Sequence, residues 1–593
     1  MQQAQPGMGS IPWEGGVAFR VWAPHSQSVA VVGSFNDWKA DKHPMEPEEN
    51  GYWYVDIQEA RVGDEYRFLL DKEISRIDPY AREVTSSVGN AVVHDSAFDW
   101  GSESEFSLPP VNELVIYELH IGTFVDDEQD GSGDFSTASK RLNHLKKIGV
   151  NCIEIMPIAE FPGDRSWGYN PSHIFAVEGT YGGSKGLKKL IKKCHAMGIG
   201  VILDVVYNHL GPSDLDLWQF DGWSENGKGG IYFYQDERSH TPWGDTRPDY
   251  GRPEVCQFLR DNALMWLEDY HLDGLRYDST VYMRKVDGAV LDIPEAWELF
   301  RKLNGEIRAK FPTKLLIAED LQNEDRLTAP AAADGADFHS QWCAQFVHPI
   351  RAAVTVPNDE RRSMGEVRRA IEHRFNDDVF QRVIYSESHD EVANGHQRVT
   401  SEVQPDDPQA FFARKRSSLA AGIVFTSPGI PMLFQGQEFL ESGWFQDTVP
   451  LDWDLSEEFS GMVNLYRDLI NLRLNRKGQT RGLTGQGVNV YRCDEEKNVI
   501  AFQRSDQGGP GDDVVVIANF NNDRYESFRV GFPSPGQWQV RLNSDWKRYD
   551  PSFETTSLGA VAVEEVAYDK MPCSAEMTLP RYSLLILSQD RAS

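Results

Sequence analysis

The segment VILDVVYNH (residues 201–209) has the pattern of a short buried strand that ends in polar residues, and this pattern recurs through the middle of the chain. Similar apolar, β-branched runs occur at 115–123, 152–158, 275–279, 315–319, 383–386 and 432–434, and they alternate with helical segments at 136–148, 185–197, 253–270, 295–310 and 411–422. Such alternation predicts a parallel sheet with crossover helices. Seven or eight such units in about 350 residues favour a closed (β/α)8 TIM barrel over an open sheet.

Alternating strand patterns without helical periodicity flank this region on both sides. Before it, runs at 16–22, 29–33, 51–57 and 66–70 are separated by turn residues, which predicts a small β-sandwich. After it, runs at 488–491, 499–504, 514–519, 538–542 and 584–587 predict a second all-β domain. We therefore expect an N-terminal β-sandwich at 1–108, the barrel at 109–480 with a long aromatic insert at 211–250 after its third strand, and a C-terminal β-sandwich at 481–593.

The composition restricts the partners of the chain. Its 593 residues carry a formal net charge of −32, which repels phosphate backbones and anionic lipid and so argues against nucleic acid and membrane surfaces. The six scattered cysteines contain no Cys-x-x-Cys pair for zinc or redox chemistry. The first residues do not resemble a secretory signal, and no apolar run is long enough to span a membrane. These features predict a cytoplasmic protein that acts on a neutral substrate.

Acidic side chains stand at the ends of four of the predicted strands, namely Asp204, Asp278, Glu319 and Asp390. In a barrel of this kind the C-terminal ends of the strands face the active-site mouth, so the four acids are expected at one end of the molecule. Any one of them taken singly is more often a helix cap or a solvated loop acid. Four together are difficult to explain by capping, and they predict a catalytic centre.

Two carboxyl groups in different environments are what cleavage of a glycosidic bond requires, one ionised for attack and one protonated to release the alcohol. Arg276 lies two residues before Asp278, hence on the same face of the strand. Its guanidinium is expected to keep Asp278 ionised and oriented. His209 and His389 offer N–H donors for sugar hydroxyls, although a single histidine is more often structural.

These motifs resemble those of the α-amylase family of retaining glycoside hydrolases and transglycosylases. The matching segments are DVVYNH (204–209), GLRYDS (274–279), IAED (317–320), SHD (388–390), and MP (156–157) with WGY (167–169). The resemblance implies that Asp278 is the nucleophile, Glu319 the acid/base and Asp390 the acid that holds the hydroxyls of the distorted sugar. Supporting and substrate-binding positions are matched by Trp167, Tyr169, Asp204, His209, Arg276 and His389, of which Tyr169 stacks on the sugar at the cleavage point. The substrate implied is an α-1,4-glucan such as amylose, glycogen, a starch-like polysaccharide or maltooligosaccharides.

The N-terminal segment, with WAP (22–24) and FNDW (35–38), resembles the glycogen-binding β-sandwich that precedes many branching and debranching members of the family. Trp38 and Trp53 are candidate sugar platforms, because an aromatic face packs well against the apolar face of a pyranose. Trp22 is expected in the core of the sandwich.

The motifs divide between two kinds of family member. Segments 156–169 and 204–212, with TPWG (241–244), resemble hydrolases that release trehalose from maltooligosyl trehalose. Segments 317–320 and 388–392, with LNSD (542–545) and EEV (564–566), resemble α-glucan branching enzymes. Because the second set includes the acid/base strand and the third acid, we predict a branching enzyme. The alternatives are a maltooligosyl trehalose trehalohydrolase, an α-amylase, and a non-catalytic glucan-binding protein, which the presence of all three acids disfavours.

No cofactor is expected, and the acids of the insert show no recognisable calcium-binding spacing, so no required metal is expected either. We expect a monomer. Aromatic residues of the insert, together with Trp444 and Phe445 after the eighth strand, are expected to line the path of an acceptor chain.

Overall fold

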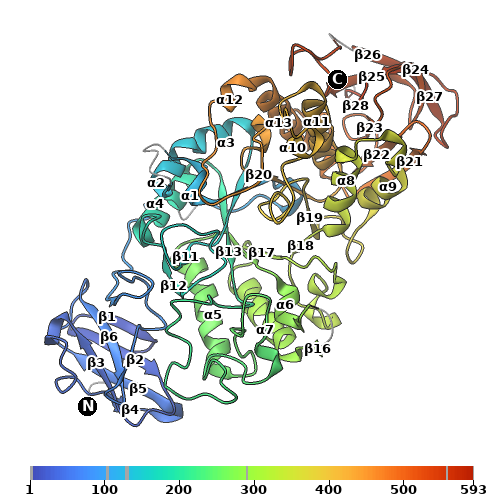
Figure 1. Cartoon of the computed structure of the whole chain (residues 1–593). Coiled ribbons are helices and arrows are strands. Elements are labelled where there is room, and N and C mark those ends of the chain that lie inside the picture. The colour runs from blue at the N-terminus through green and yellow to red at the C-terminus, as the bar shows by residue number, and fades with distance from the viewer. Residues whose placement is uncertain (1–3, 102–105, 127–131, 289–290, 556–558, 592–593) are drawn as a thin grey trace.

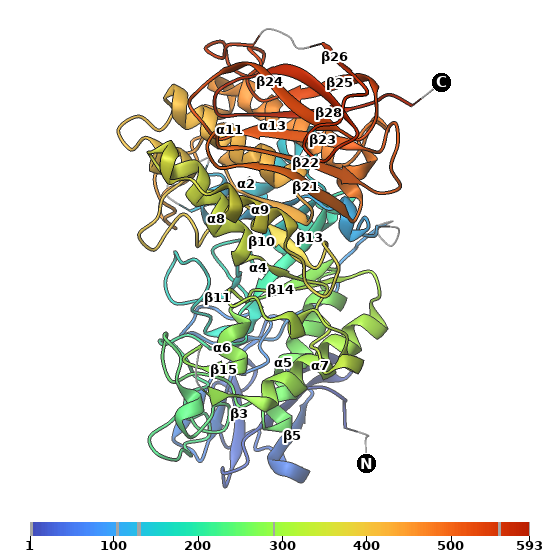
Figure 2. The same ribbon diagram turned by 90° about the vertical axis from the view of Figure 1, so that its right-hand side faces the viewer.

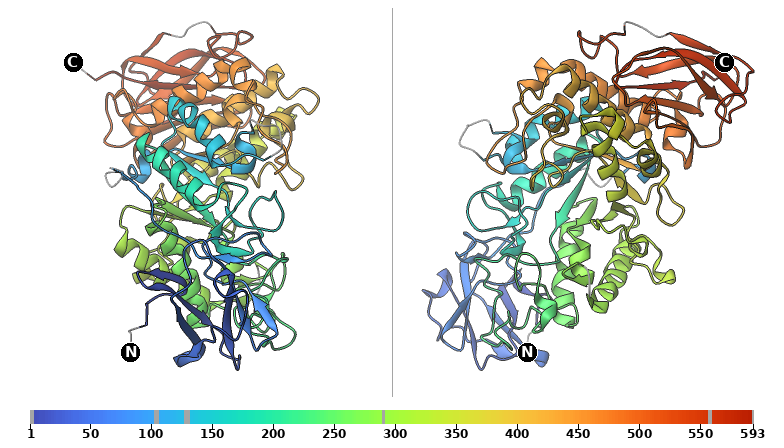
Figure 3. Two further views of the ribbon diagram at one scale, coloured as in Figure 1. Left: turned by 90° about the vertical axis from the view of Figure 1, so that its left-hand side faces the viewer. Right: turned by 45° about the vertical axis from the view of Figure 1, so that its right-hand side comes forward.

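The computed structural model describes residues 4–101, 106–126, 132–288, 291–555 and 559–591. It has three parts in chain order, a β-sandwich, a barrel and a second β-domain, and the two β-domains lie at opposite ends of the molecule with the barrel between them (Figure 1). The same order is visible after rotation by 90° (Figure 2) and in the views of Figure 3. Within these ranges, none of the helices has the length and apolar character needed to cross a membrane.

The central part is a closed barrel of eight parallel strands, which confirms the predicted (β/α)8 fold. The strands, in their order around the barrel, are β9 (Ile116–Leu119), β10 (Cys152–Ile155), β13 (Gly200–Val205), β14 (Gly274–Tyr277), β17 (Leu315–Ala318), β18 (Ser340–Trp342), β19 (Arg382–Ile384) and β20 (Ile430–Phe434). The main helices around them are α3 (Leu142–Ile148), α4 (Gly183–Ala196), α5 (Pro253–Glu268), α7 (Pro294–Lys310), α8 (Ala344–Thr355), α9 (Met364–Glu372), α11 (Phe411–Thr426) and α13 (Ser460–Arg473).

Two local expectations about the barrel were wrong. The single helix expected at 136–148 is divided into α2 (Phe135–Ala138), a 3-10 turn (Ser139–Arg141) and α3. The strand expected at 115–123 ends at Leu119, because Ile121–Phe124 forms the short helix α1. Its apolar sequence suited a strand equally well, since a short apolar run does not distinguish the two structures.

Inside the barrel, a layer of charged side chains lies above layers of apolar ones. The apolar layers include Ile116, Cys152, Ile202, Leu315, Ile317, Val383, Ile430 and Met432, which form one buried cluster. Further along the strands Glu118 pairs in register with Glu154, and Asp204 pairs with Arg276. Because side chains alternate along a strand, these four follow the inward apolar residues toward the C-terminal end. The barrel is therefore filled at its base and polar at its mouth, where the catalytic centre is expected.

The N-terminal part is built from two sheets, as predicted. One contains β1 (Gly9–Trp13), β2 (Gly16–Trp22), β5 (Tyr52–Ile57) and β4 (Glu46–Pro47), and the other contains β3 (Val29–Gly33), β6 (Glu65–Leu70), β7 (Ile74–Arg76) and β8 (Ala91–Val92). Phe19 and Tyr66 meet edge to face in the core between the sheets. Trp22 is 6% exposed and meets Tyr232 of the insert edge to face, which confirms that it is a packing residue.

The insert at 211–250 is held against this sandwich by charged and aromatic contacts. Arg67 forms an ion pair with Asp216 at 2.7 Å, and Arg76 donates hydrogen bonds to the backbone carbonyls of Phe220 and Gln219, each at 2.8 Å. His25 stacks on Trp223 with ring centroids 4.5 Å apart. The sandwich therefore supports the loop that borders the barrel mouth, and removal of the sandwich would expose this interface.

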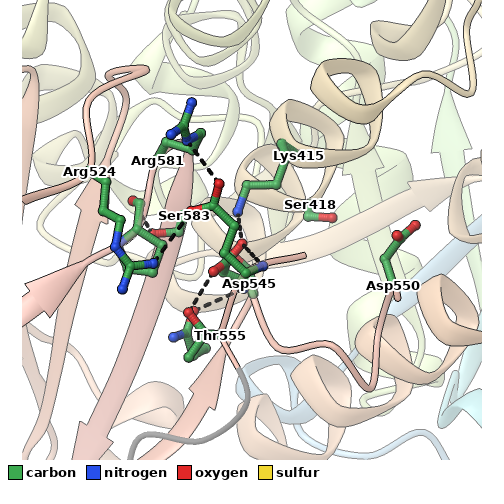
Figure 4. A network of polar contacts seen from close by, with 12 residues as sticks. Lys415, Ser418, Arg524, Asp545, Asp550, Thr555, Arg581 and Ser583 are labelled. Atoms are coloured by element: carbon green, nitrogen blue, oxygen red, sulfur yellow. Dashed lines mark hydrogen bonds and ion pairs between the residues drawn. The ribbon is translucent and has the colours of Figure 1, made fainter. Parts of the chain in front are cut away.

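The C-terminal part consists of a six-stranded sheet and a two-stranded sheet. The larger contains β21 (Gly487–Asp494), β22 (Val499–Ser505), β23 (Val514–Asn519), β28 (Ser583–Ser588), β25 (Gly536–Asn543) and β26 (Ala560–Val563), and the smaller contains β24 (Tyr525–Phe532) and β27 (Cys573–Leu579). Lys415 of α11 reaches Asp545 just beyond β25, with Nζ and Oδ1 2.6 Å apart and both side chains fully buried (Figure 4). The hydroxyl of Thr555 donates to the other carboxylate oxygen at 2.6 Å. This ion pair joins the domain to the barrel.

Candidate active site

The two principal acids are placed by the strand ladders themselves. Asp278 follows β14 and Glu319 follows β17, each one residue beyond the end of its strand. The backbone N–H of Asp278 donates to Val205 O and that of Glu319 to Tyr277 O, both at 3.0 Å. These bonds extend the parallel ladders by one step, so neither acid is on a free loop. The adjacent strands therefore bring the two side chains to one end of the barrel, as predicted.

Arg276 connects three carboxylates through one buried guanidinium group. Its Nη1 donates to Asp278 Oδ1 at 3.1 Å and also hydrogen-bonds to Asp204, while Nη2 lies 3.0 Å from Glu319 Oε2. The side chain is fully buried and lies over the ring of Trp342, with 4.2 Å between the guanidinium carbon and the ring centroid. In so dry a setting the arrangement needs all its partners, because an unpaired charge there is costly.

Each acid also has a hydrogen-bond donor of its own. Asn208 donates from Nδ2 to Asp278 Oδ2 at 2.6 Å, and the backbone N–H of Ser279 donates to Glu319 Oε2 at 2.7 Å. Asn208 thus belongs to the site, although the sequence reasoning gave it no role within its motif.

Burial shifts the pKa values of the two acids to different extents. It raises the pKa of Asp278 to about 6, against the opposing charge of Arg276. It raises the pKa of Glu319 to about 7, where Arg276 again opposes and the negative charges of Asp278 and Asp390 add to the increase. Asp278 therefore ionises first as the pH rises, and Glu319 keeps its proton longer. This is the division between nucleophile and acid that glycosidic cleavage requires.

Asp390 and His389 approach the same centre from the loop after β19. Asp390 is partly exposed and accepts a hydrogen bond from Asn394 at 2.6 Å. Its negative charge adds to the rise in the pKa of Glu319. The imidazole of His389 is 25° from parallel to the ring of Tyr169, with centroids 5.1 Å apart. The loop after β19 therefore places His389 beside Tyr169, and the roles of His389 and Asp390 in binding sugar stay predictions.

Tyr169, Trp167 and His209 complete the wall of the site. The hydroxyl of Tyr169 donates to Asp204 Oδ2 at 2.5 Å, and Trp167 meets His389 edge to face. His209 donates from Nε2 to the carbonyl of Tyr169 at 2.8 Å, and its Nδ1 faces the side-chain oxygen of Asn208. Both ring nitrogens of His209 are thus engaged within the protein. In this conformation His209 therefore acts on the site by holding Tyr169 and Asn208 in place.

Trp38 and Trp53 lie on the β-sandwich, away from the barrel mouth, and they differ from each other. Trp38 is 43% exposed and follows a 3-10 turn with a positive φ of 60°. Trp53, in β5, is partly buried and donates from its indole nitrogen to Ala23 O at 3.1 Å. Trp38 has the exposure that a sugar platform needs, whereas part of the Trp53 ring packs within the sandwich.

Two further residues of the site were missed from the sequence. Glu118 contacts His389, and its signal was visible, since a charged residue in the apolar run IYEL (116–119) needs a buried partner. Trp342 supports Arg276, but it lies in β18, a strand of three residues that was not predicted. Among the described residues, no group of three or more His, Cys, Asp or Glu side chains is arranged to hold a metal ion.

Three domain models match the chain in the order of its structural parts. Carbohydrate-binding module 48 (isoamylase N-terminal domain) matches residues 7–81, the α-amylase catalytic domain matches residues 119–238, and the α-amylase C-terminal all-β domain matches residues 491–590. The closed barrel, its arginine-linked carboxylates and the two flanking β-domains therefore define a member of the α-amylase family.

Among curated proteins, the chain is similar over nearly its whole length to 1,4-alpha-glucan branching enzymes. It is 31% identical to one from Xanthomonas euvesicatoria pv. vesicatoria (strain 85-10), over 98% of this chain and 80% of that protein. It is 30% identical to one from Bacillus subtilis (strain 168), over 96% and 92% respectively. The chain belongs to the family of 1,4-α-glucan branching enzymes.

Solved structures agree with this fold. The pullulanase type I from Bacillus subtilis str. 168, complexed with maltose, has a TM-score of 0.78 at 21% identity, covering 99% of this chain and 86% of its own. A putative alpha amylase from Salmonella typhimurium has a TM-score of 0.74 at 22% identity, covering 98% and 99%. At these identities the likeness concerns the fold.

Proposed function

We propose that the chain is an α-glucan branching enzyme that cleaves an α-1,4 bond and transfers the released chain to a 6-hydroxyl, making an α-1,6 branch. The observation that carries the proposal is the similarity to branching enzymes across all three structural parts, together with a complete set of catalytic acids. Because that set is complete, we do not favour a non-catalytic glucan-binding protein.

The proposed reaction is a double displacement with retention. Glu319 donates its proton to the glycosidic oxygen while the Asp278 carboxylate attacks the anomeric carbon, so the C–O bond to the leaving chain breaks and a glycosyl ester forms on Asp278. The ionised Glu319 then takes the proton of an acceptor 6-hydroxyl, whose oxygen attacks the anomeric carbon and releases Asp278. Asp390 and His389 would hold sugar hydroxyls, and Tyr169 would stack on the ring at the cleavage point.

Transfer in place of hydrolysis requires a bound acceptor chain and exclusion of water. Two exposed tryptophans at the rim support an acceptor path. Trp243 is 40% exposed and stacks on His209, and Trp444 is 53% exposed on the loop after β20. The neighbouring Phe445 was also expected to line this path, but it is 4% exposed and packs against Trp167. Phe445 supports the wall of the site, so Trp243 and Trp444 are the candidate platforms.

The test is product analysis on amylose, with Asp278→Asn as the inactive control. A branching enzyme lowers iodine absorbance while creating few reducing ends, because each transfer conserves their number. A debranching enzyme should then release short linear chains from the product. Rapid growth in reducing ends without debranchable product would favour an α-amylase. Release of trehalose from maltooligosyl trehalose, with amylose unchanged, would favour the trehalohydrolase.

We also propose a cytoplasmic location for this activity. The support is that all six cysteines, each within the described ranges, are free thiols, which suits a reducing compartment.

A further inference from the structure

Glu118 holds His389 at two points. It stands in β9 and is 1% exposed. This strand pairs with β20 and so closes the barrel. Its Oε1 lies 2.5 Å from Nδ1 of His389, and its Oε2 accepts the backbone N–H of the same residue at 3.1 Å. One carboxylate therefore fixes both the backbone and the imidazole of a residue that adjoins Asp390.

These two hydrogen bonds determine how the imidazole faces the site. A carboxylate can only accept a hydrogen bond, so Nδ1 of His389 must carry a proton. The remaining nitrogen, Nε2, is the one that can reach a ligand, and it donates when the ring is an imidazolium. Stacking against Tyr169, with Trp167 at the edge, restricts the plane of the ring. The direction of the Nε2–H bond is thereby set before substrate arrives.

The ionisable groups near His389 come from several elements of the barrel. They are Glu118 on β9, His120 beyond it, Glu154 on β10, Asp204 on β13, Arg276 and Asp278 from β14, and Asp390 next in sequence. Burial by itself lowers the pKa of His389, but the charge and hydrogen bond of Glu118, with Asp390, raise it to about 9 against the opposing charge of Arg276. Glu118 is thus the group that both hydrogen-bonds to His389 and contributes most to the rise in its pKa.

We propose that Glu118 is a positioning residue for the transfer reaction, which holds His389 with Nε2–H directed at a sugar hydroxyl of the bound α-glucan. This inference rests on the proposed function for the identity of the ligand. The hydrogen-bonded pair itself does not, because it is formed within the protein.

Glu154 provides a matched control. It pairs in register with Glu118 on the adjacent strand and is equally buried. Burial raises its pKa well above the usual value, which favours the protonated form, so Glu154→Gln keeps the shape of the side chain and is expected to change the local charge less than Glu118→Gln does. Glu118→Gln has the same size change but removes a charge and one of the two accepting oxygens.

The first measurement is the titration of His389 by NMR of imidazole-labelled protein without substrate, with His389→Gln used to assign its signal. Glu118→Gln should lower the midpoint by about one to three pH units, the range found for loss of a close opposite charge. Glu154→Gln should leave the midpoint nearly unchanged. An unchanged midpoint in Glu118→Gln, in a protein whose circular dichroism matches the wild type, would overturn the proposal, as would equal shifts in both variants.

The second measurement is the pH profile of chain transfer. In Glu118→Gln, KM for the glucan should rise at the alkaline side more than at pH 6, where the imidazole can still be protonated. A loss of equal size at every pH would assign Glu118 to folding and overturn the positioning role. Failure of the proposed branching activity would appear in the product analysis, whereas failure of this inference would appear in the titration.

Discussion

The ion pair between Lys415 and Asp545 offers a stability prediction that can be worked from its geometry. Asp545→Asn removes the negative charge that faces Lys415 Nζ at 2.6 Å, where both side chains are fully buried. Asparagine keeps the shape of aspartate and an oxygen that can accept from the Thr555 hydroxyl. The substitution therefore tests the charge with little change in packing. Figure 4 shows that the lysine reaches this carboxylate from the barrel side.

The expected loss follows from two opposing quantities. At 2.6 Å and an effective dielectric constant of about 20, the attraction is about 6 kcal/mol. Transfer of each ion from water costs several kcal/mol, so the intact pair contributes little net stability. Removal of one partner leaves the cost of the other uncompensated, and Asp545→Asn should destabilise the joint by about 3–5 kcal/mol. Lys415→Met combined with Asp545→Asn leaves no charge, so the double variant should recover at least about 2 kcal/mol of that loss.

The measurement is native-state hydrogen exchange at α11 and β25, because exchange reports the opening free energy of a local region in a multidomain protein. Arg548→Gln is the surface control, since its ion pair with Asp468, at 3.1 Å, involves an arginine that is 54% exposed. That control should cost less than about 1 kcal/mol. If Asp545→Asn lowered the opening free energy as little as the control does, the reasoning would be refuted. It would also be refuted if the loss in the double variant equalled the sum of the losses in Asp545→Asn and Lys415→Met made singly.

Further predictions concern catalysis and binding. Asp278→Asn should abolish turnover yet leave glucan binding nearly intact. Glu319→Gln should lose most of its activity on glucan but regain part of it on substrates with a good leaving group, which need no proton in the first step. Equal losses of activity on glucan and on such activated substrates would contradict an acid role for Glu319. The pH profile of kcat/KM should fall below about pH 6 as Asp278 becomes protonated and above about pH 7 as Glu319 loses its proton. A fall near pH 7 that persists in Glu319→Gln on such activated substrates would contradict the assignment. Trp38→Ala should weaken action on long polysaccharide by about tenfold or more and spare short maltooligosaccharides, because a second site helps a ligand that spans both; similar losses on both would exclude a platform role. A crystal structure should place the carboxyl groups of Asp278 and Glu319 about 5–5.5 Å apart, and about 7 Å or more would contradict retention.

The sequence predicted the barrel because most of its strands are buried apolar runs between longer helices. It did not predict β18, whose three residues, Ser-Gln-Trp, carry neither a β-branched run nor alternation. It predicted a helix at 136–148 as one element, although a 3-10 turn at Ser139–Arg141 divides it. The strand β18 depends on its neighbours in the sheet, and the turn depends on how the helices beside it pack, neither of which local propensity reports.

The site was predicted where chemistry marks the strand ends. Asp278, Glu319 and Asp390 could be found because acids at four strand ends have few structural explanations. Glu118 was overlooked because its partner, His389, lies 271 residues away in sequence, and such a contact follows from the closure of the barrel. The expected role of Phe445 was wrong for a similar reason, since sequence shows that a residue is aromatic but not which side of a loop it faces.

The guanidinium of Arg276 has a practical consequence for anyone who wishes to change the working pH of this enzyme. A substitution there alters the environment of the nucleophile and the acid together, so it moves both limbs of the profile and cannot widen or narrow it in a controlled way. To shift the pKa of one acid without the other, the change must be made at the hydrogen-bond donor that contacts only that acid. Asn208 is a side chain and can be replaced to move the acid limb. The donor to Glu319 is the backbone of Ser279, whose φ of 41° lies in the left-handed region. The alkaline limb is therefore adjusted through the shape of this turn, for which glycine is the natural first substitution.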